Sequence, residues 1–270
     1  MSSYVITGVS RGLGFEFLRQ LSSDSSNTVI GLVRNKATTE SSIEKEFPGR
    51  KNIHILEADV TNYDALERAA ATTASITGGS LDYLIGNAGL ISMFSAYDGL
   101  HKLANQPKAL EKELLDSFKV NVIGQIHLIN IFLPLILKGN AKKVIVLGTG
   151  LADDALTINL EHEIAGSYSI SKAAVNTAIA KFAAELGKDG VLFLSLSPGY
   201  VDTNQYKDAT EEQLKSIQIM GQKFAKYAPH FTGPMSPEES IKAMLAVIEK
   251  ATPEKEGGQA LSHYGNKQWL

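Results

Sequence analysis

The sequence contains no cysteine among its 270 residues. Disulfide bonds, thiolate catalysis and cysteine-ligated zinc are therefore excluded by composition. The six histidines show no H-x-x-x-H or histidine–carboxylate ligand spacing, so no metal site is expected. Ser195 and Ser197 lie in an apolar segment without the G-x-S-x-G motif, which argues against a serine hydrolase.

Long charged runs and long apolar runs are missing as well. No run of lysine or arginine can follow a phosphate backbone and the formal net charge is only -3, so nucleic acid is not an expected partner. The longest apolar stretch, Val122 to Leu137, is interrupted by three polar residues and is shorter than the roughly 20 residues that span a bilayer. This stretch is typical of a buried helix, so no membrane contact is expected. The N-terminus lacks the basic and apolar regions of a secretory signal, which leads us to expect a cytoplasmic protein.

Short apolar segments alternate with longer helical patterns, which indicates βαβ units and a parallel sheet covered on both faces. Strands are expected at Tyr4–Thr7, Thr28–Arg34, Asn52–Ala58, Leu81–Gly86, Lys143–Leu147 and Val191–Ser197, with a seventh near Gln259–His263. Helices are expected at Leu13–Leu21, Thr38–Phe47, Tyr63–Ile76, Pro107–Leu137, Tyr168–Gly187 and Pro237–Lys250. The sequence therefore predicts an α/β fold: one Rossmann-type domain over residues 1–270, with a doubly wound parallel sheet of about seven strands and helices on both faces.

Two segments, Leu90–Gln106 and Val201–Pro234, match no helix or strand pattern well. Because both follow strands, we expect them to lie over the carboxyl edge of the sheet, where open α/β sheets bind ligands. They are the expected substrate loops, 90–106 and 201–234. Their larger side chains are candidates to line an apolar pocket, although scattered apolar residues more often serve packing: Met93, Phe94, Tyr97, Tyr206, Met220 and Phe224.

A glycine motif, T-G-V-S-R-G-L-G at Thr7–Gly14, stands between the first expected strand and the first expected helix. Glycines let the backbone turn tightly and approach a pyrophosphate, while the helix N-terminus offers unpaired N–H groups. The spacing differs from G-x-G-x-x-G, because three residues separate Gly8 from Gly12. Such turns also occur for purely geometric reasons. The position of this one, at the first βα junction, favours a dinucleotide site.

Tyr168 and Lys172 are four residues apart on an expected helix, so their side chains share one face. A nearby cation stabilises phenolate and should lower a tyrosine pKa that starts near 10. The pattern predicts a general acid/base. Taken in isolation, an ordinary surface tyrosine and lysine would be the better interpretation.

The second expected strand ends in Val33-Arg34-Asn35, without the acidic residue that holds the ribose 2′-hydroxyl of NAD. Arg11 in the glycine loop faces the same corner, and a planar guanidinium suits the 2′-phosphate of NADP. The alternative is two exposed arginines on a solvated face. Their coincidence at one site favours NADP (NADPH) as the cofactor.

In their order along the chain, these motifs closely resemble the short-chain dehydrogenase/reductase family over essentially the whole length. Within that family the sequence is most similar to the sniffer-like carbonyl reductases and the bacterial C-factor proteins. The motifs are T-G-x-x-x-G-x-G at Thr7–Gly14, D-V at Asp59-Val60, N-A-G at Asn87–Gly89, Y-x-x-x-K at Tyr168–Lys172 and P-G-x-V-x-T at Pro198–Thr203.

The resemblance implies roles for individual residues. Tyr168 should protonate the carbonyl oxygen, Lys172 should hold the nicotinamide ribose, and Asn121 should anchor a water in a proton relay. Asn121 in isolation would be a satisfied polar residue in a helix. Together, the resemblance and the residue patterns predict cofactor contacts from Gly8, Ser10, Arg11, Gly12, Leu13, Gly14, Arg34, Asp59, Val60, Asn87, Ala88, Gly89, Tyr168, Lys172, Pro198, Gly199, Val201 and Thr203.

One position departs from the family pattern. Members carry a Ser-Ser pair at the end of the fifth strand, and this chain has Gly148-Thr149. Thr149 keeps a hydroxyl that can donate the same hydrogen bond, with a stiffer and bulkier side chain. The predicted catalytic residues are therefore Asn121, Thr149, Tyr168 and Lys172, with reduced or redirected activity as an open alternative.

The leading hypothesis is an NADPH-dependent carbonyl reductase that acts on a small carbonyl or alcohol. A biosynthetic reductase dedicated to one substrate, and a dinucleotide-binding regulatory protein with little turnover, remain alternatives. The helices Pro107–Leu137 and Tyr168–Gly187 are apolar over more than one face, and family members often dimerise there, so we expect a homodimer.

Overall fold

The computed structural model describes residues 1–203 and 210–270 and is built around one parallel sheet. Its seven strands follow the order β3-β2-β1-β4-β5-β6-β7, and every neighbouring pair is parallel. They are β1 (Ser3–Thr7), β2 (Thr28–Val33), β3 (Ile53–Glu57), β4 (Tyr83–Gly86), β5 (Lys143–Leu147), β6 (Leu192–Ser197) and β7 (Ala260–Ser262). This is the doubly wound Rossmann order, so the predicted fold class is confirmed.

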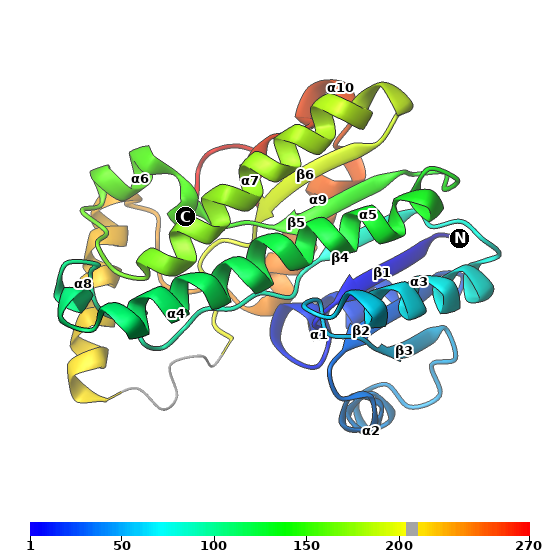
Figure 1. The fold of residues 1–270 in the computed structure, drawn as a ribbon, viewed down its shortest axis with the longest axis horizontal. Helices are drawn as coiled ribbons and strands as arrows, with labels where there is room; N and C mark the ends of the chain where they lie inside the picture. The colour runs from blue at the N-terminus through cyan, green and yellow to red at the C-terminus, as the bar shows by residue number, and fades with distance from the viewer. Residues whose placement is uncertain (204–209) are drawn as a thin grey trace.

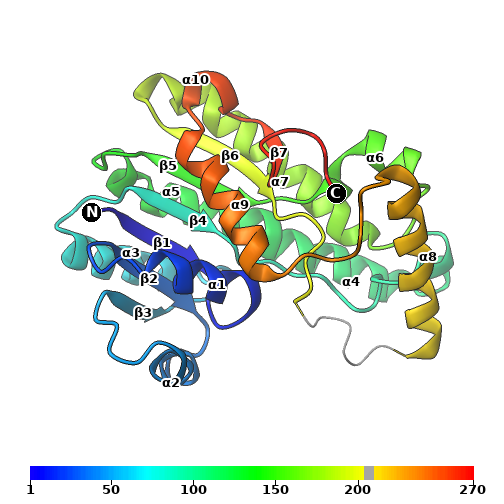
Figure 2. The same cartoon turned by 180° about the vertical axis from the view of Figure 1, so that it is seen from behind.

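Helices cover both faces of the sheet (Figures 1 and 2). On one face lie α3 (Tyr63–Thr77), α5 (Gly124–Ile136) and α7 (Gly166–Leu186); on the other lie α1 (Gly12–Leu21), α2 (Lys36–Glu46) and α9 (Pro237–Lys250). The short α10 (Pro253–Glu256) precedes β7.

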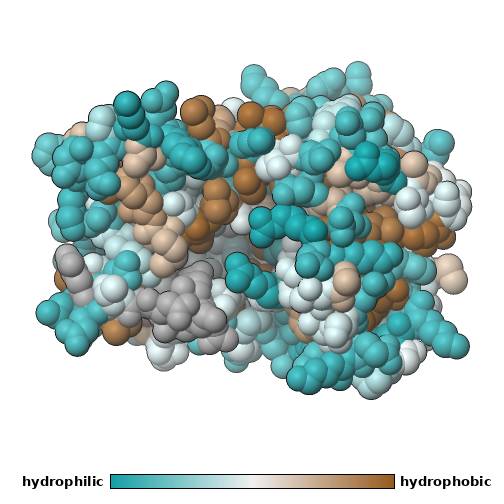
Figure 3. All heavy atoms as spheres, turned by 60° about the horizontal axis from the view of Figure 1, so that its bottom comes forward, coloured by the Kyte–Doolittle hydropathy of each residue, from teal (hydrophilic) through white to brown (hydrophobic). Residues whose placement is uncertain are grey.

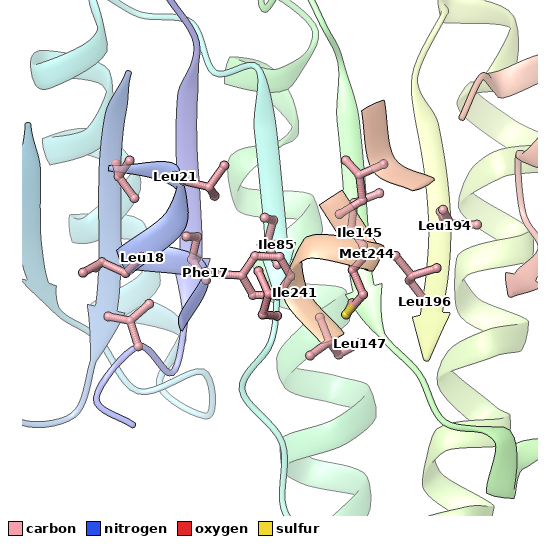
Figure 4. Packing of buried hydrophobic residues seen from close by; sticks show 14 of the residues in the cluster. Phe17, Leu18, Leu21, Ile85, Ile145, Leu147, Leu194, Leu196, Ile241 and Met244 are labelled. Atoms are coloured by element: carbon pink, nitrogen blue, oxygen red, sulfur yellow. The ribbon is translucent and has the colours of Figure 1, made fainter. Parts of the chain in front are cut away.

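The core forms two layers because successive strand residues point to opposite faces. In β5, Ile145 and Leu147 face α1 and α9, whereas Val144 and Val146 face the α3, α5 and α7 side. Figure 4 shows the core layer on the side of α1 and α9, in which Phe17 and Ile241 lie over the strands beside Ile85. The continuous apolar character of the strands follows from burial on both sides.

The expected helix Pro107–Leu137 is present with an interruption. It consists of α4 (Pro107–Phe118), a π-helical turn (Lys119–Ile123) and α5, which run on from one another. Pro107–Ile136 is long and apolar enough to cross a membrane by length and composition. However, α5 packs against the sheet with Leu128, Ile129 and Phe132 fully buried, which agrees with the buried helix predicted from the sequence.

The expectation of no regular element between 201 and 234 is wrong for α8 (Glu211–Tyr227). A capping box formed by Thr210 and Gln213 starts this helix, and Ile217, Met220 and Phe224 recur at helical spacing. Tyr206, a predicted pocket residue, lies outside the described residues. Sequence reading also missed α6 (Asp154–Asn159), which Asp153 caps. Within 90–106 the structure has one 3-10 turn, Lys102–Asn105.

Candidate active site

A cavity of about 920 Å³ opens at the carboxyl ends of the strands. The glycine loop, the ends of β2 and β4, the 90–97 segment, the start of α7 and one face of α8 form its walls. Figure 3 shows a hollow near the centre of this side of the molecule, bordered in part by hydrophobic residues. Of the predicted site residues, the following line the cavity: Gly8, Ser10, Arg11, Gly12, Leu13, Gly14, Arg34, Asp59, Val60, Asn87, Ala88, Gly89, Tyr168 and Thr203.

The glycine loop has a backbone that only glycine adopts easily. Gly8 and Gly12 have φ values of 73° and 58°, in the left-handed region. A Cβ added to Gly14 would lie 2.2 Å from the Gly8 carbonyl oxygen, so α1 packs against the loop only with glycine there. Arg11, at the N-cap of α1, makes no side-chain cap, which leaves the first N–H groups of the helix available to an anion.

Asn87 ties the end of β4 to this loop. Its Nδ2 donates to the carbonyl oxygens of Thr7 and Gly8 at 2.8 and 3.2 Å. The Ala88 N–H in turn donates to Thr7 Oγ1 at 2.9 Å. The N-A-G motif therefore fixes the loop in place as well as lining the cavity.

The residues predicted to select the cofactor lie around the same cavity. Arg11 and Arg34 are both exposed and line it, and neither forms an ion pair with a carboxylate of the described residues. The Asp59 carboxylate is already hydrogen-bonded to a residue close in sequence. Its Oδ1 accepts from the N–H and the hydroxyl of Thr61, each at 2.8 Å. Two guanidinium groups are thus left free to bind a phosphate.

Tyr168, Lys172 and Thr149 come together where β5 ends and α7 begins. The Thr149 side chain hydrogen-bonds Tyr168. Lys172 Nζ lies 5.8 Å from the centroid of the Tyr168 ring and donates to the Leu147 carbonyl oxygen at 2.6 Å. The Thr149 hydroxyl also accepts from the Leu151 N–H at 3.2 Å. The predicted common face of Tyr168 and Lys172 is present.

The protonation of this pair differs from the expectation. Burial raises the pKa of Tyr168 to about 12, and the hydrogen bond with Thr149 opposes this only in part. Burial lowers the pKa of Lys172 to about 8. The expected lowering of the phenol pKa is therefore not met, because loss of solvent outweighs the lowering by its neighbour Thr149. Both shifts favour neutral side chains, and the phenol is protonated at neutral pH.

Asn121 is fully buried and lies in the π-helical turn. Its Oδ1 accepts from the Leu90 N–H at 2.8 Å, and its Nδ2 donates to the Leu90 carbonyl and to Ser171 Oγ, both at 2.9 Å. The side chain therefore anchors the loop that follows Gly89 and has no hydrogen left to donate. A proton relay at this residue would have to use the second lone pair of Oδ1 or the main chain of the π-helical turn, where the regular bonding pattern is interrupted.

Six further predicted residues are not among those that line the cavity: Asn121, Thr149, Lys172, Pro198, Gly199 and Val201. Gly199, with a φ of 81°, packs on the ring of His263, and Val201 pairs with Met235 in a parallel bridge. In the P-G-x-V-x-T motif, Thr203 is the residue that reaches the cavity.

Sequence reasoning missed part of the wall that surrounds the substrate end. Of the apolar candidates, Met93, Tyr97 and Met220 line the cavity, while Phe94 lines a neighbouring one and Phe224 packs in a cluster beneath α8. The additional wall residues are Ile91, Leu151, His162, Ile164, Ala165 and Ile217. The cap at Thr210 and the helical spacing after it could have placed Ile217, but no pattern marks His162.

The comparisons agree with this geometry. A family model described as short chain dehydrogenase matches residues 3–214. The chain is 58% identical over 271 residues to the short chain dehydrogenase virK of Hypocrea virens, with 100% of both sequences covered. Its fold is similar to that of an NADPH-bound carbonyl reductase from chicken fatty liver (TM-score 0.78, 22% identity, 98% of both chains). It is also similar to the carbonyl reductase Sniffer of D. melanogaster (TM-score 0.77, 24% identity, 98% of both chains).

The chain therefore belongs to the short-chain dehydrogenase/reductase family of oxidoreductases. This family uses nicotinamide dinucleotides and acts on small molecules.

Proposed function

We propose that the protein is an NADPH-dependent carbonyl reductase. The observation that carries this proposal is the position of Tyr168. Its phenol, bonded to the Thr149 side chain, faces the cavity that also contains the glycine loop and the two free arginines. A proton donor and a dinucleotide-binding loop thus border one cavity.

The residues present fit a dinucleotide. The left-handed Gly8 and Gly12 and the uncapped start of α1 suit a pyrophosphate. Gly89 lines the cavity next to two of the predicted catalytic residues, since a Cβ there would lie 3.3 Å from Asn121 Oδ1 and 3.5 Å from Lys172 Nζ. Lys172 is the residue at this point that would hold the nicotinamide ribose. When bound, the cofactor supplies a hydride.

Tyr168 completes the reduction with a proton. Because the high pKa keeps the phenol protonated, it can donate to the carbonyl oxygen as negative charge develops there. The Thr149 hydroxyl, which interacts with the phenol, would hydrogen-bond the same oxygen and so stabilise that charge. A protonated phenol is the form that reduction needs, which supports reduction over alcohol oxidation near neutral pH.

Selection of NADPH over NADH rests on Arg11 and Arg34. Both guanidinium groups border the cavity and have no carboxylate partner among the described residues. Charge-assisted hydrogen bonds to a 2′-phosphate would engage them. The carbonyl reductase from chicken fatty liver, named as NADPH-bound, is consistent with this preference.

A biosynthetic reductase dedicated to one substrate would use the same four residues. A purely regulatory dinucleotide sensor is disfavoured by the intact contact between Tyr168 and Thr149.

The test measures NADPH consumption, followed as a fall in its absorbance, with a panel of aldehydes, aromatic ketones and quinones. We expect turnover with at least one class, and we expect Tyr168→Phe to remove most of it. Tyr264→Phe is the matched control, since Tyr264 lies half exposed away from the cavity. If the unmodified protein reduces no compound of the panel faster than Tyr168→Phe does, the proposed activity is refuted and the regulatory alternative is favoured.

We also propose a homodimer through α4 and α7. Leu115, Phe118 and Ile123 along α4 and the turn after it are 64%, 37% and 45% exposed, and Ile170 on α7 is 42% exposed. Large apolar side chains gathered on adjoining helices are typical of a protein interface. Light scattering at micromolar concentration should give twice the 29.1 kDa chain mass, and a monomer would contradict the proposal.

A further inference from the structure

A buried carboxyl group joins the 90–97 segment to the start of α7. It belongs to Glu113 of α4, which is 6% exposed. Its Oε1 accepts a hydrogen bond from the hydroxyl of Ser95 at 2.8 Å, and its Oε2 accepts one from the hydroxyl of Ser167 at 3.0 Å. Both serines are buried as well. One side chain of α4 therefore connects two segments that both border the cavity.

The carboxyl group has no cation beside it. No lysine, arginine or histidine of the described residues forms an ion pair with Glu113, and the adjacent Lys112 pairs with Asp116 instead. Glutamate is almost never fully buried without such a partner, because removing a carboxyl group from water is costly. A contribution to stability is thus a poor explanation for Glu113. Its two hydrogen bonds explain its position better.

The bond with Ser167 is one of two that fix how α7 is rotated about its axis. Four residues further on, Ser171 Oγ accepts from Asn121 Nδ2 at 2.9 Å. Residues four apart share one face of a helix, so both serines lie on the face of α7 that packs against α4 and the π-helical turn. Each serine directly precedes a member of the Tyr168 and Lys172 pair, whose face is turned by about 100° from the serine face. Both bonds therefore limit how far the phenol can move.

On the other side, Glu113 provides the second of two attachment points for the 90–97 segment. Asn121 holds the segment at Leu90, and Glu113 holds it five residues further along the chain. Ile91 and Met93 lie between the two points and line the cavity. The position of this part of the cavity wall thus depends on both polar side chains.

The residue that precedes α7 depends on the same contact. Ala165, the N-cap of α7, has a φ of 57°, in the left-handed region that non-glycine residues rarely adopt. Its N–H donates to the carbonyl oxygen of Ser95 at 2.9 Å. Such a conformation persists only where the surroundings fix it. By bonding the Ser95 hydroxyl, Glu113 supports the turn from which α7 begins, three residues before Tyr168.

We propose that Glu113 is a positioning residue that couples the 90–97 segment to the proton donor. Its carboxyl group keeps Ser95 and Ser167 at a fixed separation, so that a substrate bound against the segment meets the Tyr168 phenol. Glu113 does not line the main cavity and acts through these neighbours. The catalytic part of this proposal rests on the reductase function proposed above, whereas the structural coupling does not.

Two substitutions distinguish the hydrogen bonds from the volume of the side chain. Glu113→Leu removes both acceptors at a similar size, whereas Glu113→Gln can still accept from one serine and donate to the other. Glu113→Leu should lower kcat/KM for a verified carbonyl substrate by about 10–100-fold, because a small misplacement of the reacting groups is enough. Glu113→Gln should retain most of the activity. Both variants should bind NADPH with an unchanged dissociation constant, since the glycine loop and the two arginines lie elsewhere on the cavity wall.

A double-mutant cycle tests the coupling itself. Ser95→Ala and Ser167→Ala each remove one of the two bonds. If Glu113 joins the two segments, the combined variant should lose less activity than the product of the single losses, because either change alone breaks the connection. The serine variants remove single hydroxyls, so this test stays available if Glu113→Leu does not fold. Losses that multiply, or equal kcat/KM in Glu113→Leu and the unmodified protein, would overturn the proposal.

Hydrogen–deuterium exchange tests the structural coupling without requiring turnover. In Glu113→Leu the amides of residues 90–97 and 165–168 should exchange about 10-fold faster, the change expected for the loss of one hydrogen bond. Glu67→Leu makes the same change on the exposed side of α3 and should leave both segments unaltered. Unchanged exchange in Glu113→Leu would overturn the proposal. Absence of turnover in the unmodified protein would instead refute the reductase function, so the two failures are distinguished.

Discussion

The hydroxyl of Ser195 occupies the space that a side chain at position 148 would need. A Cβ added to Gly148 would lie 2.4 Å from Ser195 Oγ, and that hydroxyl is held at 2.6 Å from Asn176 Oδ1. Any side chain at position 148 would therefore have to displace the Ser195 hydroxyl from this hydrogen bond. Of positions 148 and 149, only Thr149 carries a hydroxyl, and it interacts with Tyr168.

Gly148→Ser should therefore destabilise the protein, although it restores the family sequence. Overpacking a dense core costs about 1–3 kcal/mol. Urea unfolding should show this loss, and the double variant Gly148→Ser with Ser195→Gly should recover most of it because the clash is removed. Equal stability of Gly148→Ser and the unmodified protein would show that Ser195 moves aside freely.

Thr149 is expected to act on the substrate oxygen in the transition state. Thr149→Val keeps the shape without the donor, so it should lower kcat by about 10²–10³-fold with a small change in KM. Thr149→Ser should preserve or raise the rate. If Thr149→Val is kinetically silent while Tyr168→Phe is inactive, the phenol alone serves the oxygen.

Arg34→Asp should reverse or erase the preference for NADPH. The substitution replaces a phosphate-binding cation with a carboxylate that suits a free ribose hydroxyl and repels the 2′-phosphate. Affinities for NADPH and NADH are measured by calorimetry, with Arg68→Asp on the exposed side of α3 as a control for the same change in charge. Equal affinities for the two cofactors in the unmodified protein would contradict the assignment.

His263 should make the fold sensitive to acid. The ring is 2% exposed and burial lowers its pKa to about 4, from roughly 6.5 in an unfolded chain. Below pH 6.5 the unfolded chain takes up a proton that the folded chain refuses, so the free energy of unfolding falls as the pH drops toward 4. The loss reaches at most about 3 kcal/mol.

Denaturant titrations at pH 7 and pH 5 measure this effect. His263→Gln should lose less stability between the two pH values than the unmodified protein, whereas His101→Gln, at an exposed position, should lose as much. An equal loss in all three proteins would assign the acid sensitivity to other groups. His162, whose pKa burial also lowers, would then be the next residue to test.

The sheet and the glycine loop were predictable because local patterns decide them. Buried strands are apolar throughout, and Gly8, Gly12 and Gly14 are required by backbone conformation and close contact that no other residue tolerates. The motif at Tyr168 and Lys172 needed only helical spacing to place both side chains on one face.

The protonation state and the substrate end were not predictable in the same way. Whether burial or the nearby cation decides the pKa of Tyr168 depends on how many protein atoms surround both groups, which sequence spacing does not contain. His162 comes from a turn without periodicity, and contacts from α8, distant in the sequence, place it in the wall. Helix α8 itself was missed although its capping box and apolar spacing are readable.

The most direct test of the catalytic assignment is the comparison of Tyr168→Phe with the unmodified protein in two measurements. Replacing the phenol removes the proton donor while leaving the glycine loop and both arginines unchanged, so NADPH should bind with nearly the same dissociation constant. Turnover of a verified carbonyl substrate should fall by about 10²–10⁴-fold, the usual contribution of general acid catalysis. Retention of most of the turnover by a folded Tyr168→Phe variant that still binds NADPH would contradict the role of Tyr168.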